Sequence, residues 1–423
     1  MTEGMAGRSG IVLSPRCDAV MRRSSILIRL FDYLGLLFGI AAVLAVLYYW
    51  DPTRVMIKRL APGAEARFEQ MPKGATDLTL ADLLTLNEAA AVDMRRRTLI
   101  NKVFGVSGLP LDLMPQRIIR DVEKTPGAVK KCLSPTGPSL VHLWSRMDTI
   151  IMRGIGCEAR FYRDWRNLAG IDELTGHMQN RWRNYAIAYF RPVQANGRLI
   201  LYQQGLAATY HDQHRLIEGW VAEGYTVAAM NMPGYGDNTC YDLERYCVDP
   251  PMGGMYDKEL AQNFAPPVIA LNHAMAQTSF EHIAMVGVSS GAWVTLVAAA
   301  LDPRIDLSVP VAGVLPLNLL QGKEESARGI VAGLTDIASV LDLAVMGADR
   351  PGRRQIQIFN RFDRCCFYGP RPESYASDLQ RSAAALGGRL DLLFDESHAR
   401  HKISDWALRR IMAAIDGGAE RAE

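Results

Sequence analysis

The sequence predicts an α/β fold in which a mostly parallel sheet carries helices on both faces. The first observation behind this prediction is that short apolar segments alternate with helical ones from about residue 185 to residue 415. The second is a tight turn, Gly287-x-Ser289-x-Gly291, between a predicted strand and a predicted helix. The third is that a serine, an aspartate and a histidine each follow a different predicted strand. Functional groups of open parallel sheets collect in such loops.

The predicted strands are short apolar segments bounded by turn residues. They cover residues 185–190, 198–202, 225–230, 282–286, 305–312, 355–359 and 389–394. Asn196 and Gly197 separate the first two strands, and this dipeptide is typical of a hairpin turn. An antiparallel hairpin is therefore expected to open the sheet. Helices are predicted at residues 214–223, 256–277, 293–301, 315–345 and 404–415.

Length and composition indicate a globular protein with a sizeable core. The chain has 423 residues, of which 49% are hydrophobic and 22% charged, so its central part is not expected to be disordered. The net charge of +2 argues against a nucleic-acid-binding protein that relies on a dense basic face. No internal repeat or long low-complexity tract is present.

One apolar block near the N-terminus predicts a membrane anchor. Residues 33–50 carry no charged side chain and, at about 1.5 Å per residue, nearly cross a hydrocarbon core of about 30 Å. Residues 26–30 can extend this helix, so the anchor is assigned to residues 26–50. No small-x-small cleavage site follows, which argues against a signal peptide. The basic residues on either side slightly favour an inside N-terminus, which predicts a single-pass protein with its large C-terminal part outside the cytoplasm.

These features divide the chain into four predicted parts. They are an N-terminal tail (1–25), the anchor (26–50), a helical extension (51–155) and the α/β domain (156–423). Within the extension, residues 76–97 have the apolar spacing of an amphipathic helix. Within the α/β domain, residues 315–348 are interpreted either as a lid that shapes an acyl pocket or as ordinary packing helices.

The seven cysteines do not form a metal-binding or redox pattern of the Cys-x-x-Cys type. Cys240 and Cys247 flank a short loop and could pair, while Cys365 and Cys366 are adjacent. Buried free thiols are the simplest interpretation of this arrangement. We therefore expect no metal and no organic cofactor.

Residues 180–415 resemble the α/β-hydrolase superfamily. Gly287 to Gly291 has the form of that family's nucleophile elbow. The Met232-Pro-Gly-Tyr-Gly-Asp237 stretch resembles the family's Asp-x-Pro-Gly-x-Gly turn, with Asn231 where an acid is more usual. Gly205-Leu206 resembles the segment that supplies an oxyanion-hole amide, although Gln204 stands where the family has histidine. The resemblance implies a Ser, Asp, His triad in that chain order.

The triad roles follow from the chemistry of each side chain. A serine hydroxyl becomes a good nucleophile when a histidine takes its proton and a carboxylate orients that histidine. Ser289 is the predicted nucleophile, Asp363 the predicted acid and His398 the predicted base. The backbone amides of Leu206 and Ser290 are the predicted oxyanion donors.

Two of these roles have alternatives. His398 lies four residues past Phe394, the usual distance of the family's histidine from its last strand, and His401 is the alternate base or a supporting partner. Asp395 is the alternate acid.

The predicted function is that of a membrane-anchored serine hydrolase. It would cleave a carboxylic ester or thioester through an acyl-serine intermediate, and its partners would be a small-molecule ester or acyl substrate and a membrane, with no nucleic acid. The alternatives are an acyltransferase that uses the same triad and a non-catalytic binding protein that keeps the fold.

Overall fold

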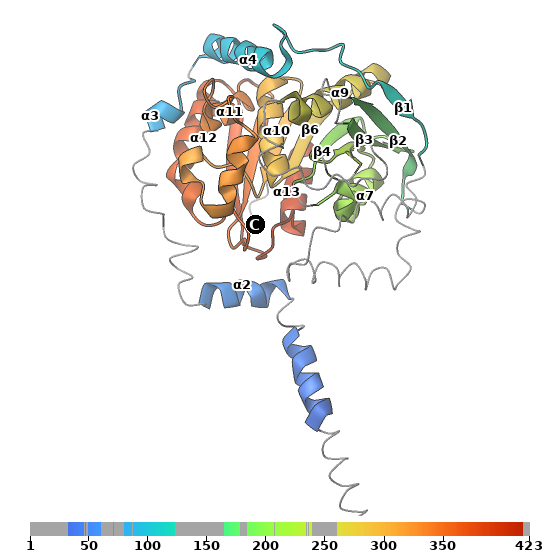
Figure 1. Ribbon diagram of the computed structural model, residues 1–423, viewed down its shortest axis with the longest axis vertical. Helices are drawn as coiled ribbons and strands as arrows, with labels where there is room; N and C mark the ends of the chain where they lie inside the picture. Colours follow the sequence, from blue (N-terminus) through green and yellow to red (C-terminus); the bar gives the residue numbers. More distant parts are fainter. Residues whose placement is uncertain are drawn as a thin grey trace, which may run out of the picture. The chain divides into compact units, whose positions relative to one another are not determined.

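The structure is a computed structural model (Figure 1). It describes residues 33–45, 47, 50–60, 71, 80–86, 88–122, 165–177, 184–206, 208–233, 235, 237–238 and 260–417. The chain divides into two compact units, Met1–Lys58 and Arg59–Glu423.

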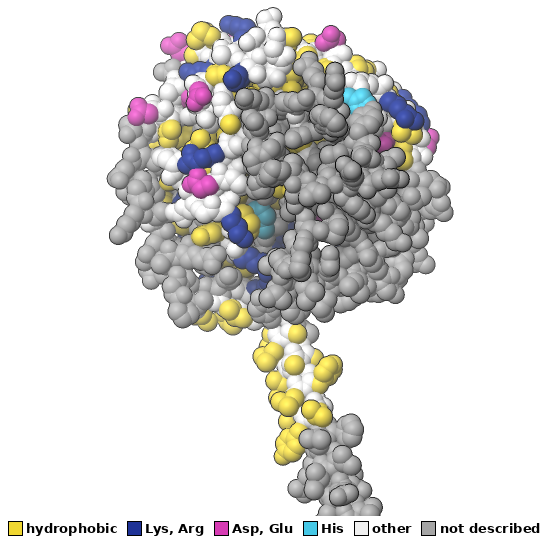
Figure 2. Space-filling model, in the orientation of Figure 1, with side chains coloured by type: hydrophobic (Ala, Val, Ile, Leu, Met, Phe, Trp, Pro, Cys, Tyr) yellow, Lys and Arg dark blue, Asp and Glu magenta, His cyan; other side chains and the backbone are white. Residues whose placement is uncertain are grey.

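The first unit contains an apolar helix over residues 33–45. Its large apolar side chains are exposed, with Phe38 reaching 78% exposure, and Figure 2 shows apolar side chains along the visible face of this helix. Within the described part of the chain, no helix combines the length and apolar character needed to cross a membrane. Residues 26–32, 46, 48 and 49 of the predicted anchor lie outside the described residues. Helix α2 (Asp51–Leu60) follows.

The second unit is built on a nine-stranded sheet with the order β1-β2-β3-β5-β4-β6-β7-β8-β9. Strands β1, β2 and β3 are antiparallel to their neighbours, and β4 to β9 run parallel. The predicted mostly parallel α/β sheet is therefore present. The strands are β1 (Arg117–Ile119), β2 (Leu168–His177), β3 (Asn184–Pro192), β4 (Arg198–Gln203), β5 (Thr226–Met230), β6 (His282–Val288), β7 (Leu307–Val311), β8 (Arg354–Asn360) and β9 (Arg389–Asp395).

The predicted hairpin between β3 and β4 is wrong, because β5 lies between these two strands. The antiparallel partner that precedes β3 is β2, which the sequence did not indicate. Asn196 takes part in a different contact from the one expected of a hairpin turn. Its backbone N–H donates to Gly224 O at 2.8 Å and its side chain donates to Glu223 O at 3.0 Å. These bonds hold the turn against the residues that lead into β5.

Helices cover both faces of the sheet, as predicted. Helices α9 to α12 pack into one apolar cluster and helices α7 and α13 into the other. Alternate residues of β4 divide between the clusters, since Leu199 and Leu201 belong to the first and Ile200 and Tyr202 to the second. Full burial of one such aliphatic side chain contributes about 1.5–3 kcal/mol. The helices are α7 (His214–Ala222), α9 (Ala261–Gln277), α10 (Ser290–Leu301), α11 (Val340–Met346), α12 (Ala376–Ala385) and α13 (Asp405–Ile415), with short helices η4 (Tyr210–Gln213), η5 (Leu317–Leu319), η6 (Gly322–Gly329) and η7 (Arg371–Ser374).

The predicted helix over residues 76–97 is interrupted. Helix α3 (Leu80–Leu83) ends before Thr85, and α4 (Ala89–Phe104) begins after it. The cause is a buried carboxylate on α11. Asp342 accepts from the Thr85 backbone N–H at 2.8 Å and from its hydroxyl at 2.6 Å. These charge-assisted bonds replace helical ones, so the chain leaves the helix there.

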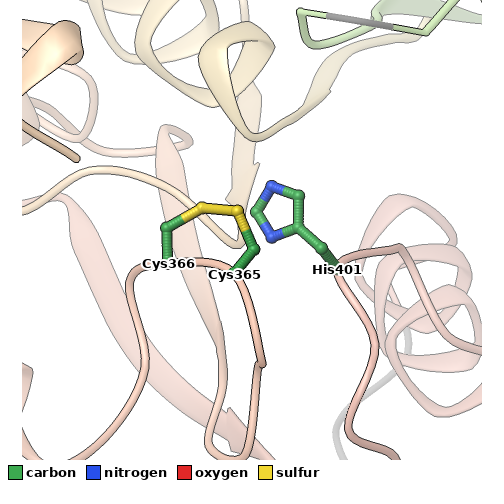
Figure 3. A group of neighbouring side chains, drawn as sticks. All are labelled: Cys365, Cys366 and His401. Carbon is green, nitrogen blue, oxygen red and sulfur yellow. A yellow bond between two sulfur atoms is a disulfide. The ribbon is translucent and has the colours of Figure 1, made fainter. Parts of the chain in front are cut away.

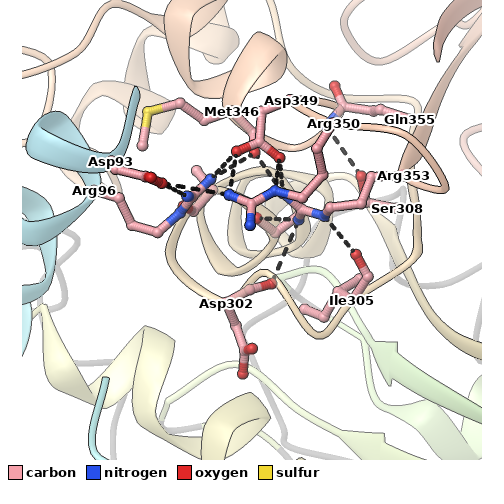
Figure 4. Close-up of polar contacts among 12 residues, drawn as sticks. Asp93, Arg96, Asp302, Ile305, Ser308, Met346, Asp349, Arg350, Arg353 and Gln355 are labelled. Atoms are coloured by element: carbon pink, nitrogen blue, oxygen red, sulfur yellow. Dashed lines mark hydrogen bonds and ion pairs between the residues drawn. The ribbon is translucent and has the colours of Figure 1, made fainter. Parts of the chain in front are cut away.

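A buried ion cluster attaches α4 to the α/β domain (Figure 4). Asp349 lies 2.5 Å from Arg96 Nη2 of α4 and 2.6 Å from Arg353 Nη1, and all three side chains are almost fully buried. Burial alone would raise the pKa of Asp349, but the surrounding arginines outweigh it and lower that pKa below its usual range. The described part of the extension therefore belongs to the same compact unit as the sheet.

The segment 315–348 contains η5, η6 and α11 instead of one long helix. Ile330, Val331 and Leu334 are buried in the same apolar cluster as α10. Packing against the core therefore accounts for the apolar residues of this segment.

Candidate active site

Ser289 lies at the junction between β6 and α10. Its backbone has φ 59° and ψ −123°, a conformation that costs a non-glycine residue about 1–3 kcal/mol. The Ser289 N–H donates to Val311 O of β7 at 2.9 Å, which holds this turn in place. A Cβ at Gly287 or Gly291 would lie 2.2 Å from a backbone oxygen, so only glycine fits at these positions. The strand, turn and helix expected around the pentapeptide are all present.

The loop after β4 passes directly beside Ser289. A Cβ built on Gly205 would lie 2.8 Å from Ser289 Cβ and 3.4 Å from its Oγ. No acceptor among the described residues pairs with the backbone amide of Leu206 or with that of Ser290. Ser290 also begins α10, whose N-terminal end carries a partial positive charge. Two free amides and a helix N-terminus thus lie in the turns that flank Ser289.

Asp363 follows β8 and pairs with His401. The carboxylate is fully buried, its Oδ1 accepts from the Cys365 backbone N–H at 2.7 Å, and its Oδ2 lies 2.6 Å from His401 Nδ1. A carboxylate at this distance favours the tautomer with its proton on Nδ1, which leaves the lone pair of Nε2 free. Within the described part of the chain, His401 Nε2 has no hydrogen-bond partner. This nitrogen is therefore available to take a proton.

The expected pairing of Asp363 with His398 is not present, and this part of the prediction is corrected. His398 Nε2 lies 3.2 Å from Asp395 Oδ2, and its Nδ1 accepts from the Arg400 backbone N–H at 3.0 Å. The physical reason is proximity in the loop. Asp395 ends β9 and contacts His398, which lies three residues later in the chain. His401, the next histidine, pairs with Asp363 instead.

Asp395 is the centre of a buried polar cluster. Its Oδ1 accepts from the backbone N–H and the hydroxyl of Ser397, at 2.9 and 2.6 Å, and its Oδ2 accepts from the hydroxyl of Ser404. Burial raises the pKa of this carboxyl, but the polar contacts with His398, Ser397 and Ser404 outweigh it and lower the pKa to about 2. Asp395 and His398 thus hold the loop that presents His401.

Comparison with known proteins gives structural neighbours only. No protein family model and no curated protein matches the sequence. Among solved structures, methylesterase BT1017 superposes with a TM-score of 0.52 at 14% identity, over 80% of this chain and 69% of that chain. The chain has the α/β-hydrolase fold. This confirms the resemblance to the α/β-hydrolase superfamily at the level of the fold.

Two further neighbours of this α/β-hydrolase fold are also named as esterases. An acetyl xylan esterase from Paenibacillus sp. R4 has a TM-score of 0.48 at 14% identity, over 82% of this chain and 100% of that chain. An esterase from Pyrococcus furiosus has a TM-score of 0.41 at 16% identity, over 59% of this chain and 93% of that chain.

Asn360 is a site residue that the sequence did not identify. It ends β8, is fully buried, and its Nδ2 donates to Arg400 O at 3.3 Å and to Lys402 O at 2.9 Å. These two carbonyls belong to the residues on either side of His401. Asn360 therefore fixes the backbone of the histidine loop, and the only sequence signal for it is an amide at the end of an apolar strand.

A second unidentified group holds the loop after β8. Glu324 of η6 and Arg371 of η7 form a buried, bidentate ion pair with N–O distances of 2.6 and 2.7 Å. Glu324 also accepts from the backbone N–H of Phe367, whose φ is 55°. The pair therefore fixes the far end of the loop that begins with Asp363.

The prediction of free thiols at Cys365 and Cys366 is wrong, because these adjacent residues form a disulfide. Figure 3 shows the disulfide beside the imidazole of His401. The loop also contacts the elbow helix, since the rings of Phe367 and Trp293 of α10 lie 6.4 Å apart. The disulfide is thus part of the loop that carries Asp363, the predicted acid.

The two departures from the family pattern have structural roles. Asn231 Oδ1 accepts from the Tyr210 backbone N–H at 2.8 Å, so the amide holds the start of η4 against the turn after β5. Gln204 is buried and its Oε1 accepts from the Tyr202 hydroxyl. The Gly205-Leu206 backbone reaches Ser289 although the usual histidine is absent.

Proposed function

We propose that this protein is a serine hydrolase that cleaves a carboxylic ester or thioester through an acyl-serine intermediate. The observation that carries the proposal is the 2.6 Å contact between Asp363 and His401, with His401 Nε2 left unpaired among the described residues. The strained elbow at Ser289 supports it, because such a turn exposes a hydroxyl. The names of the structural neighbours also favour an ester-cleaving activity.

In the proposed reaction, Ser289 Oγ attacks the carbonyl carbon while His401 Nε2 takes the hydroxyl proton. Asp363 stabilises the imidazolium that forms, and it keeps its own charge. His401 then gives the proton to the leaving oxygen or sulfur. Water repeats the sequence on the acyl-serine, which releases the acid and restores Ser289.

The negative charge that develops on the carbonyl oxygen needs donors that are already in position. The backbone amides of Leu206 and Ser290 are suited to this role, because neither has an acceptor among the described residues. Each donor of this kind contributes about 3 kcal/mol of transition-state stabilisation. The N-terminal end of α10 adds favourable partial charge.

We also propose that residues 26–50 attach the protein to a membrane and that the hydrolase part lies outside the cytoplasm. The exposed apolar side chains of the helix over residues 33–45 support the attachment. The Cys365–Cys366 disulfide supports the location, because disulfides persist in oxidising compartments. Alkaline-phosphatase fused after residue 423 should be active in cells, and an inactive fusion that is made at normal levels would contradict this topology.

Labelling with a fluorophosphonate probe tests the nucleophile. The wild-type protein should take up one probe molecule per chain, and Ser289→Ala should not react. Ser326→Ala on η6 is a matched control that should label like the wild type. Equal labelling of Ser289→Ala and wild type would refute the assignment, and no labelling of a folded wild type would refute the serine hydrolase proposal.

A further inference from the structure

The Cys365–Cys366 disulfide lies beside a histidine whose reactive nitrogen is free. One ligand atom from each of Cys365, Cys366 and His401 lies within 4.8 Å of the other two. Cys365 is exposed, so a reductant in solution can reach its sulfur, and Cys366 is buried. Figure 3 shows the imidazole and the two sulfur atoms side by side.

His401 is arranged as a metal ligand commonly is. Its Nδ1 is held by a buried carboxylate, Asp363, at 2.6 Å. Histidines that bind metals typically place the second nitrogen on such a carboxylate, which orients the ring and increases the basicity of the ligating nitrogen. The ligating nitrogen would be Nε2, which has no partner in the described part of the chain.

The distances suit a tetrahedral thiophilic cation. With Zn–S of about 2.3 Å and Zn–N of about 2.0–2.1 Å, neighbouring ligand atoms of a tetrahedral zinc site lie about 3.5–3.8 Å apart. One ligand atom of each side chain lies within 4.8 Å of the other two, so once the S–S bond is broken the sulfur atoms must move apart and the imidazole must approach, each by about 1 Å. Two thiolates and one imidazole are a ligand set that zinc prefers over magnesium or calcium.

We infer that reduction of the Cys365–Cys366 disulfide creates a binding site for a thiophilic cation, formed by both sulfur atoms and His401 Nε2. A phosphine reductant breaks the S–S bond, takes an oxygen atom from water to become its oxide, and leaves one proton on each sulfur. Zinc then displaces both thiol protons into the buffer and forms two Zn–S bonds and one Zn–N bond. A fourth position stays open to water.

This site and the proposed catalytic base share one atom. Zinc on His401 Nε2 would prevent that nitrogen from taking the proton of Ser289, so hydrolysis and zinc binding would exclude each other. While the disulfide is intact, neither sulfur atom is a thiolate that can bind zinc. His401 Nε2 therefore stays available to take the proton of Ser289. This consequence for activity rests on the proposed function, whereas zinc binding itself does not.

Zinc binding to the full-length chain tests the inference. The protein is reduced with the phosphine, desalted without oxygen, and titrated with Zn²⁺ against a chromogenic chelator. The reduced wild type should bind one zinc ion that the disulfide form does not bind. Cys365→Ser/Cys366→Ser should bind at least 100-fold more weakly, and His401→Ala at least tenfold more weakly.

Matched controls separate this site from other thiols and histidines. Cys240→Ser/Cys247→Ser also removes two thiols, and His214→Ala removes a histidine of α7, and both should keep the affinity of the wild type. Co²⁺ in place of zinc should give a thiolate-to-cobalt absorption band in the reduced wild type only when Cys365 and Cys366 are present. The inference would be overturned if the reduced wild type and Cys365→Ser/Cys366→Ser bound zinc equally well. It would also be overturned if the loss of zinc affinity appeared in Cys240→Ser/Cys247→Ser instead.

The two proposals can fail separately. A reduced chain that binds zinc but never reacts with a fluorophosphonate would refute the hydrolase proposal and leave the zinc site intact. A chain that hydrolyses esters and binds no zinc after reduction would refute only the zinc site.

Discussion

Two aspartate–histidine pairs lie at the ends of β8 and β9, and they differ in the direction that the Nε2 atom of each histidine faces. In the Asp395–His398 pair, the histidine is 1% exposed, its Nε2 faces Asp395 Oδ2 at 3.2 Å without a well-aligned hydrogen bond, and its Nδ1 accepts from the Arg400 backbone N–H. In the Asp363–His401 pair, the histidine side chain is 22% exposed and Nε2 has no partner among the described residues. The same two residue types therefore form a structural pair in one case and the proposed catalytic pair in the other.

The comparison shows that the remaining contacts of a histidine decide its role. Asp395 receives bonds from Ser397 and Ser404 as well as the contact with His398, so its pair is a closed cluster that fixes the loop. Asp363 receives one backbone N–H and one imidazole, and the chemistry then depends on the nitrogen that points away from it. A closed cluster stabilises the fold, and an open one can move a proton.

Removing each histidine in turn should separate the two roles most strongly. His401→Ala should lower kcat for an activated ester about 10⁴-fold, because Ser289 loses its proposed base. His398→Ala should lower the free energy of unfolding by about 2 kcal/mol, because it leaves Asp395 buried with one partner fewer. Steady-state kinetics and urea unfolding measure the two effects.

Similar losses of turnover in the two variants would contradict this division of roles. If His398→Ala lost as much turnover as His401→Ala in protein that is fully folded, the assignment of the base to His401 would be wrong. Equal and mild losses in both variants would exclude either histidine as the sole base.

Removing a contact that positions the loop of His401, without changing either aspartate–histidine pair, should have a smaller effect on kcat. Asn360→Ala removes the two bonds to the carbonyls beside His401 and should lower kcat about 100-fold, as displacement of a catalytic group by about 1 Å does. KM should change little, because both bonds that are lost go to backbone carbonyls of the histidine loop. Asn231→Ala, which loses a bond in a different loop, is the comparison variant, and a loss of kcat as large as that of Asn360→Ala would argue against specific positioning.

Lowering the pH should reduce the free energy of unfolding through protonation of Asp395. Its pKa is about 2 in the folded protein and 3.8 in the reference state, so its ionised form favours folding above pH 4 and this contribution is lost as the pH falls from about 4 to about 2. The full contribution is about 2 kcal/mol, and about half of it should be gone at pH 3. Asp395→Asn should lack this part of the pH dependence. Urea unfolding of both proteins at pH 5, 4 and 3 measures the difference, and parallel curves would contradict it.

Much of the fold could be predicted because the relevant signals are local. The apolar segments of β4 to β9 contain side chains for both faces of a parallel sheet, and the elbow at Ser289 depends on two glycines that are neighbours in sequence. The path of β5 between β3 and β4 could not be predicted, because Asn196 and Gly197 are typical of a hairpin. Their actual contacts lie with residues 223 and 224.

The candidate site could be predicted only to within a few residues. Ser289 comes directly after β6 and Asp363 three residues after β8, so the strand ends were enough to propose them. His398 and His401 are three residues apart in one loop, and Asp395 and Asp363 are both within reach. Sequence spacing cannot distinguish these pairings, because the distance along the loop does not give its path in space.

The sequence by itself determined the α/β class, the strand–turn–helix at Ser289 and the chain order of serine, aspartate and histidine. Local apolar patterns and glycine sterics decide these features, and both are written in consecutive residues. The tertiary structure alone decided that Asp363 pairs with His401, that Asn360 holds the histidine loop and that Cys365 and Cys366 lie beside the imidazole. These contacts join residues up to 42 positions apart, so they exist only once the sheet has brought its strand ends to one edge.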